Sequence, residues 1–457
     1  MPQSSVPIAL VEKVDHQKAA YAKKRPNSLA LHQRALGPLP GGNSRSQLHF
    51  DPFPFYHARA EAQLLTDVDG FSYIDVVNNY TSLIHGHPTT DMIERLSEAG
   101  GNWSGVGIPT ELEIRLAEII TSRVPSVDQV RFTNSGTEAG LYAIRAARVF
   151  TGRDDLIKAE GGYSGGWEAA QVSVKHVGDA RGESVAEPGI PSNIAGSTHV
   201  FAFNDIDHAV GVIERHGSKS AAVIIEPMQG SAGAIPPDPG FLEAIRDATV
   251  RTGCLLVFDE VMTLRLGLGG LQGAIGVIPD MTIMGKIIGG GLPVGAFGGR
   301  ADIMAATDPR SPGSLMHAGT FNANPVTMAA GIQSMEMLDA EAFERINGYG
   351  DDLRSWINAE ASERELALVS TGVGNIVQVH CSPIAPKSYR DSSQYVKQPL
   401  DLLFFELLER GVFAAPGRIL MTMTTPMTEE TIGRIKTAFS SAFDLLESVG
   451  YRLVSAS

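Results

Sequence analysis

Between about residue 129 and residue 300, short apolar runs rich in β-branched residues alternate with longer helix-like segments. The runs read QVRFT, LIKAE, THVFAF, AAVIIEP, CLLVFDE, MTIMG and VGAFGG. Runs of this kind, separated by helical stretches such as residues 241–252, are typical of βαβ units, which build a mainly parallel sheet with helices on both faces. The alternation therefore predicts a central α/β domain.

The last part of the chain has a different pattern. Helix-like segments at about residues 351–363, 402–410 and 429–448 enclose two strand candidates, NIVQVH and RILMTM. Helices and strands arranged in this way predict a smaller α+β domain. We expect an N-terminal segment (residues 1–87) that joins the small domain, a large α/β domain (residues 88–337) and the C-terminal small domain itself (residues 338–457).

Composition argues against several classes of function. The 457 residues carry a net charge of −14, whereas binding to nucleic acid or to an anionic membrane needs a basic surface. Cys254 and Cys381 are too few for a disulfide framework or a four-thiolate metal site. The sequence shows neither an apolar stretch of roughly 18 residues nor a convincing N-terminal cleavage signal. We therefore expect a soluble protein of the cytoplasm.

Polar residues end several of the apolar runs, and in an open α/β sheet the ligand binds beyond the carboxyl ends of the strands. The Ser-Gly-Thr turn in RFTNSGTEAG offers hydroxyls and backbone N–H groups at a helix start, which suits a phosphate dianion. An ordinary helix cap by Thr133 or Ser135 is the alternative, and this segment alone favours the cap. The candidates at the strand ends are Thr133, Asn134, Ser135, Gly136, Thr137, Glu226, Asp259, Glu260 and Lys286.

Lys286 stands between an apolar run and three glycines in DMTIMGKIIGGG. It does not belong to a phosphate-binding P-loop, because Asp280 and Ile287 occupy positions where that motif needs Gly and Ser or Thr. It is either a lysine that reaches past a strand end to solvent or an amine nucleophile held in a pocket. Asp259, which ends another apolar run, is either half of a structural salt bridge or the partner of a functional cation.

A phosphate cradle, a carboxylate and a lysine at one sheet edge suit pyridoxal phosphate (PLP). The lysine would form a Schiff base with the cofactor, the carboxylate would keep the pyridine nitrogen protonated, and the helix start would hold the phosphate. Over most of its length the sequence also resembles a known family. FTNSGTEA, EPMQG, LLVFDEVMT and TIMGKIIGGGLPVGAFGGR are similar, in the same order, to signatures of the class III (ω-type) aminotransferases of PLP fold type I.

This resemblance implies an architecture and a set of residue roles. It implies a large domain with a mainly parallel seven-stranded sheet, a small α+β domain from both chain ends, and a homodimer with shared active sites. It further implies that Lys286 binds the cofactor and carries the proton, and that Asp259 pairs with the pyridinium nitrogen. The other implied contacts are Val261 and Tyr163 on the two ring faces, Ser135, Gly136 and Thr137 on the phosphate, Thr320 on the phosphate of the neighbouring subunit, and Glu226 in a supporting position.

Departures from the family pattern bear on the substrate. Ser164 follows Tyr163 where the family usually has histidine, so a histidine contact near the ring is missing. Ser231 stands where ornithine- and GABA-type members carry a glutamate, which disfavours a terminal diamine or an ω-amino acid. NSRS, which contains Arg45, and the Pro-Phe-Pro that follows resemble the β-amino acid aminotransferases. Glutamate-1-semialdehyde 2,1-aminomutases usually show Val-Asn-Ser-Pro-Val-Arg there.

We therefore expect an aminotransferase that moves an amino group from a carboxylate-bearing amine, preferably a β-amino acid, to an α-keto acid by a ping-pong mechanism. Arg45 would grip the donor carboxylate through two parallel hydrogen bonds, unless it is a surface arginine of a glycine-rich loop. Arg418 is the candidate for the carboxylate of the acceptor. An intramolecular aminomutase is the main alternative, and a catalytically silent protein of the same fold is a third.

Two other patterns have both a functional and a structural interpretation. His85 and His87 in HGHP could bind a metal ion, but no third ligand is evident, so a structured loop is favoured and we expect no metal. Phe53 and Phe55 could line a pocket for an apolar side chain or belong to the core.

Overall fold

A seven-stranded sheet forms the centre of the protein. The computed structural model describes residues 7–100, 105–394 and 396–452, and its large sheet has the strand order β4-β10-β9-β8-β7-β5-β6. Neighbouring strands are parallel except at β10, which runs antiparallel to β4 and β9. The predicted mainly parallel, seven-stranded α/β fold is thus confirmed. The strands are β4 (Gln129–Thr133), β5 (Asp155–Ala159), β6 (Thr198–Phe201), β7 (Ser220–Ile225), β8 (Leu255–Asp259), β9 (Met281–Gly285) and β10 (Gly295–Gly299).

Helices cover both faces of this sheet, as its uninterrupted apolar runs predict. In β8, Leu256 and Phe258 pack into one core with α8 and α9, whereas Leu255 and Val257 pack into a second core with α6. The alternation follows from the two-residue period of a strand. The predicted helix at residues 241–252 is α9. The helices of this part are α5 (Glu111–Arg123), α6 (Gly136–Thr151), α7 (Ser192–Gly196), α8 (Ile206–His216), α9 (Phe241–Thr252), α10 (Gly270–Ile275), α11 (Ala301–Met304) and α12 (Pro325–Glu336).

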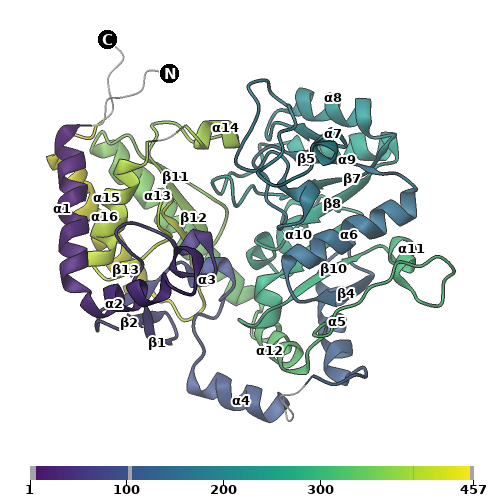
Figure 1. Cartoon of the computed structure of the whole chain (residues 1–457), viewed down its shortest axis with the longest axis horizontal. Coiled ribbons are helices and arrows are strands. Elements are labelled where there is room, and N and C mark those ends of the chain that lie inside the picture. Colours follow the sequence, from purple (N-terminus) through teal and green to yellow (C-terminus); the bar gives the residue numbers. More distant parts are fainter. Residues whose placement is uncertain (1–6, 101–104, 395, 453–457) are drawn as a thin grey trace.

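The N-terminal and C-terminal segments of the chain lie together on the left of Figure 1. A four-stranded sheet joins β1 (His57–Glu61), β2 (Leu64–Asp67) and β3 (Ser72–Asp75) to β13 (Val412–Phe413), which pairs in parallel with β3. Strands β11 (Val369–Thr371), β12 (Ile376–His380) and β14 (Leu420–Thr422) form a third sheet. Because segments from both ends share one sheet, we propose that the chain divides as expected, at residues 87 and 337.

Helices from both ends complete this smaller part. The helix-like segments of the C-terminal sequence lie in α13, α15 and α16, and α1 from the N-terminal segment packs against α15. The helices are α1 (Ile8–Lys24), α2 (Pro26–Ala35), α13 (Ala340–Glu363), α14 (Tyr389–Ser392), α15 (Gln398–Glu409) and α16 (Glu429–Ser448).

The short helix α3 (Asn78–Thr81) lies between the two parts of the molecule (Figure 1), and α4 (Thr90–Gly100) follows it. The φ angles of Asn78, Asn79, Tyr80 and Thr81 are 50°, 49°, 54° and 74°, so all four residues are left-handed. This conformation costs an L-residue roughly 1–2 kcal/mol and normally occurs at single residues, mostly glycine, asparagine or aspartate. Surrounding contacts must therefore hold the turn.

The aromatic residues of the FPF segment belong to the core. Phe53 is 2% exposed and its ring centroid lies 5.4 Å from that of Tyr21. Phe55 packs against Phe413 with a centroid distance of 4.9 Å. These contacts support the core interpretation of the pair.

The histidines of HGHP take part in a structured loop. Nδ1 of His85 lies 3.0 Å from Thr425 Oγ1, and its Nε2 lies 2.9 Å from the carbonyl oxygen of Ser334. His87 Nε2 lies 2.9 Å from a carboxylate oxygen of Asp75. Within the described residues, no group of three or more His, Cys, Asp or Glu side chains is arranged to hold a metal ion.

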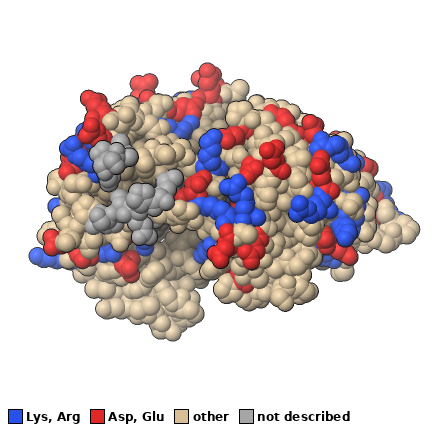
Figure 2. Space-filling model, turned by 90° about the horizontal axis from the view of Figure 1, so that it is seen from above, with Lys and Arg blue, Asp and Glu red and all other residues tan. Residues whose placement is uncertain are grey.

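The surface carries charges of both signs. On the face shown in Figure 2, lysine and arginine side chains are interspersed with aspartate and glutamate and form no continuous basic area. In the part of the chain that the structure describes, no helix is both long enough and apolar enough to cross a membrane.

Candidate active site

Lys286 follows β9 and begins the 3-10 helix η5 (Lys286–Gly289). Its φ angle of 52° is left-handed, and the residue lines a cavity beyond the edge of the sheet. Burial lowers the pKa of the amine to about 8, although the nearby carboxylates of Asp259 and Glu226 act in the opposite direction. A larger neutral fraction near pH 8 suits an amine nucleophile.

Asp259 ends the neighbouring strand β8 and lines the same cavity. It is 5% exposed, and one carboxylate oxygen accepts a 3.0 Å hydrogen bond from the backbone N–H of Val261. Burial raises its pKa to about 6, against hydrogen bonds from Val261 and the Ser164 hydroxyl and the charge of Lys286. Among the described residues it forms no ion pair, so the salt-bridge interpretation does not hold. The carboxylate can accept a cationic ligand.

The Ser-Gly-Thr turn is at once a helix cap and an anion cradle. Ser135 caps α6, because its hydroxyl accepts a 3.2 Å hydrogen bond from the N–H of Glu138. The N–H groups of Gly136 and Thr137 in the first turn have no acceptor among the described residues. Since α6 is 16 residues long, its dipole adds to these donors, and together they suit a phosphate group.

Val261 and Tyr163 form further walls of the cavity. The methyl groups of Val261 lie 3.1 and 3.3 Å from the point where Gly136 would carry a Cβ, and 3.4 Å from the same point on Gly285. Val261 thus fills the space between the anion cradle and the end of β9. Tyr163 and Thr137 line the cavity together, and the Thr137 hydroxyl accepts a 3.1 Å hydrogen bond from the N–H of Gly166 in the loop that carries Tyr163.

Glu226 follows β7 and is almost fully buried. Its carboxylate accepts hydrogen bonds from the N–H groups of Tyr163, at 2.9 Å, and Gly230, at 3.0 Å. Burial and the neighbouring Asp259 raise its pKa to about 7. Glu226 therefore fixes the loop that carries Tyr163, and it lies close enough to Asp259 and Lys286 to affect their charges.

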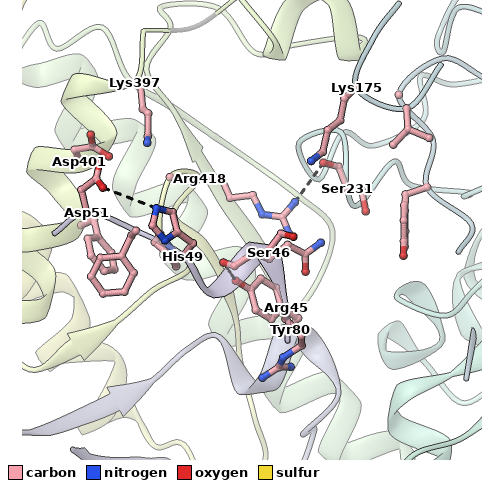
Figure 3. A pocket seen from close by; sticks show the side chains of 18 of the residues that line it. Arg45, Ser46, His49, Asp51, Tyr80, Lys175, Ser231, Lys397, Asp401 and Arg418 are labelled. Atoms are coloured by element: carbon pink, nitrogen blue, oxygen red, sulfur yellow. Dashed lines mark hydrogen bonds and ion pairs between the residues drawn. The ribbon is translucent and has the colours of Figure 1, made fainter. Parts of the chain in front are cut away.

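The cavity around Lys286, of about 390 Å³, opens into a larger outer cavity of about 820 Å³. Four residues line both: Arg45, Tyr80, Tyr163 and Ser231. Figure 3 shows the outer cavity, into which charged and polar side chains point from the N-terminal segment and from both parts of the molecule. A small substrate that enters through the outer cavity reaches Lys286 past these residues.

The two predicted substrate arginines line the outer cavity (Figure 3), and Arg45 also lines the cavity around Lys286. Arg45 is exposed, and its Nη1 donates a 2.7 Å hydrogen bond to the side-chain oxygen of Asn79. Arg418 lies over the ring of Tyr80, 5.9 Å from the centroid, and donates a 3.3 Å hydrogen bond to the carbonyl oxygen of Ser231. Burial lowers the pKa of Arg418.

Thr320 is not brought to Lys286 of its own chain. It lines a separate cavity of about 510 Å³, together with His317 and Asn324. Asn134, beside the anion cradle, donates a 2.9 Å hydrogen bond to Asn322 in the same loop as Thr320. The position is therefore near the cradle but outside the cavity, and a contact with a neighbouring subunit stays a prediction.

Sequence reasoning missed Asn79 and Tyr80, although both line the cavity around Lys286. The pair of asparagines in VVNNYTS was the available signal, because asparagine tolerates left-handed φ angles. Their approach to the site depends on contacts with the C-terminal part, which no local pattern reveals.

Comparisons with known proteins agree with this geometry. A family model described as aminotransferase class-III matches residues 46–433. The β-phenylalanine transaminase of Variovorax paradoxus is 40% identical over 88% of this chain and 89% of its own length. A glutamate-1-semialdehyde 2,1-aminomutase of Methanopyrus kandleri is 38% identical over 93% and 99%. The crystal structure of an ω-transaminase from Sphaerobacter thermophilus superimposes with a TM-score of 0.87, at 40% identity over 91% and 97% of the two chains.

The residues present fit pyridoxal phosphate. The cavity offers an amine of lowered pKa, a buried carboxylate for the ring nitrogen, an apolar valine and a tyrosine ring, and N–H groups at a helix start that have no acceptor in the described part of the chain. An amine, an acid and an anion cradle at one sheet edge are the groups that this cofactor needs. The chain belongs to the class III aminotransferase family and is a pyridoxal-phosphate-dependent transaminase.

Proposed function

We propose that the enzyme transfers the amino group of a β-amino acid to an α-keto acid by a ping-pong mechanism. The observation that carries this proposal is that Arg45 lines both cavities, while Arg418 lines the outer cavity and donates a hydrogen bond to Ser231, which lines both. A guanidinium binds a carboxylate through two parallel hydrogen bonds. The β-phenylalanine transaminase named above, at 40% identity, supports the choice of donor.

Each residue of the site has a separate role in the proposed reaction. Pyridoxal phosphate, when bound, supplies a carbonyl that takes up the amino group and a ring that accepts the electrons of the broken C–H bond. Lys286 Nζ removes the proton from the carbon that bears the amino group, for which its pKa of about 8 is well matched. Asp259 would hold the ring nitrogen in its cationic form, and the N–H groups of Gly136 and Thr137 would bind the phosphate.

Arg45 and Arg418 orient the substrates in this proposal. Arg45 would hold the donor carboxylate so that the reactive C–H bond points at Lys286, an effect of position that can be worth several kcal/mol. Arg418 would bind a carboxylate of the keto acid. No carboxylate pairs with Arg418 among the described residues, because its hydrogen-bond acceptor is the Ser231 carbonyl. An acceptor can therefore bind without first displacing an internal anion.

An apolar side chain on the donor has a place to bind. The wall of the outer cavity includes Phe50, Phe404 and Phe405, whose rings pack edge to face with centroid distances of 4.9 to 6.4 Å. An aromatic or branched β-amino acid would bury its side chain against these rings while Arg45 holds its carboxylate. Lysine and aspartate side chains on the rest of the wall, such as Lys175 and Asp401, suit the entry of a zwitterion.

Intramolecular amino transfer, as in glutamate-1-semialdehyde 2,1-aminomutases, is the second candidate, and the 38% identity to such an enzyme supports it. The two functions differ in their need for an acceptor. A transaminase left in its amine-loaded state by a β-amino acid returns to the starting absorbance when 2-oxoglutarate or pyruvate is added. An aminomutase does not need either acid for turnover.

We also propose that the enzyme is a homodimer in the cytoplasm. Thr320 lies in its own cavity beside the anion cradle, and we propose that it binds the phosphate in the neighbouring subunit's site. Two buried thiols and no disulfide among the described residues suit a reducing compartment.

Kinetics with matched substrates test the proposed donor. Arg45→Ala should raise the KM for β-phenylalanine by about tenfold to a hundredfold, the loss expected for a charge-assisted hydrogen bond, and leave 1-phenylethylamine, which has no carboxylate, unchanged. Arg45→Lys should not restore the KM, because an ammonium lacks the planar fork. Arg310→Ala is the control, since this arginine is exposed and, among the described residues, its side chain forms hydrogen bonds and an ion pair with Asp308 alone. An unchanged KM for β-phenylalanine in Arg45→Ala would refute the role of Arg45.

A further inference from the structure

The left-handed turn α3 is held by contacts from both parts of the molecule. Asn78 is fully buried, and its amide donates hydrogen bonds to the carbonyl and the hydroxyl oxygen of Thr422 at 2.9 and 3.1 Å. Its backbone N–H donates to the carboxylate of Asp75 at 2.9 Å. One end of the turn is thus fixed to β3 and β14, the strands of the smaller part.

Arg265 fixes the other end of the turn. It lies in η4 (Thr263–Leu266), four residues after Val261, and is fully buried. Its guanidinium donates to the carbonyl oxygen of Thr81 at 2.8 Å, to the carbonyl oxygen of Met423 at 2.6 Å and to the side chain of Asn375 at 2.6 Å. The acceptors of this guanidinium within the described part of the chain are all neutral, and such burial of a charge is costly. Arg265 thereby connects the segment that follows Val261 to the turn.

The middle of the turn contacts both substrate arginines. The side-chain oxygen of Asn79 accepts the 2.7 Å hydrogen bond from Arg45 Nη1, which leaves Nε and Nη2 of that guanidinium available to a carboxylate. The Tyr80 hydroxyl donates a 2.6 Å hydrogen bond to the carbonyl oxygen of Gln47, and the same ring lies under Arg418. Figure 3 shows Tyr80 between the two arginines.

We propose that Asn79 and Tyr80, held in left-handed conformation by Arg265 and Asn78, position Arg45 and Arg418 and thereby set where the enzyme accepts a carboxylate on its substrate. The proposal rests on the proposed function, since it assigns these arginines to carboxylates. Asn79 is a positioning residue that acts through Arg45. The contacts of Asn78 and Arg265 hold the four consecutive left-handed residues, and backbone strain of this kind clusters at functional sites, which supports this role.

Two substitutions at Asn79 distinguish the effect of its side-chain hydrogen bond from the effect of its backbone conformation. Asn79→Gly and Asn79→Ala both remove the acceptor for Arg45, but glycine tolerates the left-handed φ and alanine does not. If the hydrogen bond is what matters, both should raise the KM for β-phenylalanine by about tenfold with kcat unchanged. The dissociation constant of 3-phenylpropanoate, measured by calorimetry on the holoenzyme, should rise by the same factor. Neither should alter the kinetics of 1-phenylethylamine.

A double-mutant cycle tests whether Asn79 acts through Arg45. In the Arg45→Ala background, Asn79→Gly should cause no further loss, because the partner of its hydrogen bond is gone. Asn193→Gly, at an exposed asparagine of α7 outside both cavities, is the matched control and should change nothing. Additive losses in the cycle, or an equal loss for 1-phenylethylamine, would overturn the proposal.

The cycle also distinguishes failure of this inference from failure of the proposed function. If Arg45→Ala raises the KM for β-phenylalanine and the Asn79 variants do not, the inference is wrong and the role of Arg45 stands. If Arg45→Ala itself leaves both that KM and the binding of 3-phenylpropanoate unchanged, both are wrong. Tyr80→Phe keeps the ring under Arg418 and removes the hydrogen bond to Gln47. It should raise the KM for β-phenylalanine by a few-fold, and an unchanged KM would show that Tyr80 does not help to position the arginines.

Discussion

Replacing Asp259 by asparagine should abolish transamination and yet stabilise the cofactor-free protein. Asp259 is 5% exposed, and burial raises its pKa from 3.8 to about 6. Since each tenfold change in acidity is worth about 1.4 kcal/mol, the ionised carboxylate costs the fold about 3 kcal/mol at neutral pH. Asparagine has nearly the same volume, can accept the hydrogen bond from Val261 and carries no charge. The free energy of unfolding should therefore rise by up to about 3 kcal/mol.

The stabilisation should depend on pH in a defined direction. The folded protein keeps a proton on Asp259 up to about pH 6, whereas the unfolded chain releases it near pH 3.8. The cost of the charge therefore develops as the pH rises from about 4 to about 6 and is constant above that range. Urea denaturation of the two cofactor-free proteins should show a large difference at pH 8 and a small one at pH 4.5.

Asp280→Asn is the matched control for this experiment. Asp280 is 4% exposed, but it forms ion pairs with Arg246 and Arg300, both at 2.7 Å. Its replacement leaves Arg246 without its carboxylate partner and should destabilise the protein. The reasoning is refuted if Asp259→Asn destabilises the cofactor-free protein at pH 8 as Asp280→Asn does, because the buried carboxylate would then be worth more to the fold than it costs.

Three other outcomes follow from the same structure. In the cofactor-free protein, acylation of Lys286 followed by peptide mass spectrometry should show a midpoint near pH 8, and a midpoint near 10.5, the ordinary value, would contradict the lowered pKa. Gly295→Ala should weaken PLP binding at least about tenfold in a fluorescence titration, because a Cβ there would lie 2.0 Å from the Ser135 carbonyl oxygen. Gly433→Ala on α16 is the control, because a Cβ there meets nothing within 4 Å. It should raise the free energy of unfolding by roughly 0.5–1 kcal/mol. Arg265→Met should lower the free energy of unfolding by about 3 kcal/mol in urea, because it leaves buried acceptors unpaired, and a loss under about 1 kcal/mol would mean that water replaces the guanidinium.

The sheet and the candidate cofactor residues could be predicted because their signals are local. Each apolar run marks a strand that is buried on both faces, and the polar residue that ends it lies at the edge where ligands bind. Asp259 and Lys286 are 27 residues apart in the sequence, yet they end adjacent parallel strands. Topology alone therefore brings them together. Both interpretations of the segment around Ser135 hold, since the cap still leaves the N–H groups of Gly136 and Thr137 without an acceptor among the described residues.

The strands of the N-terminal segment gave no such signal. β1 and β2 are four or five residues long and mostly exposed or half-buried, so no period of two distinguishes them from loop. Their sheet is completed by β13, from the other end of the chain, which pairs with β3. Arg265 was missed for a similar reason: in VMTLRLGLGG it resembles a solvent-exposed arginine, and its acceptors come from residues 81, 375 and 423.

The difference between these two groups of residues has a functional consequence. Residues proposed to bind the cofactor lie within one sheet edge, so short motifs determine them, and related enzymes can share them whatever their substrates. Residues proposed to bind the substrate depend on α3, whose contacts with Thr422 and Arg265 span 344 and 184 positions of the chain. We therefore expect that the packing of the two parts of the molecule sets the preferred donor, and that small changes at that junction move the proposed carboxylate site while Lys286 stays in place.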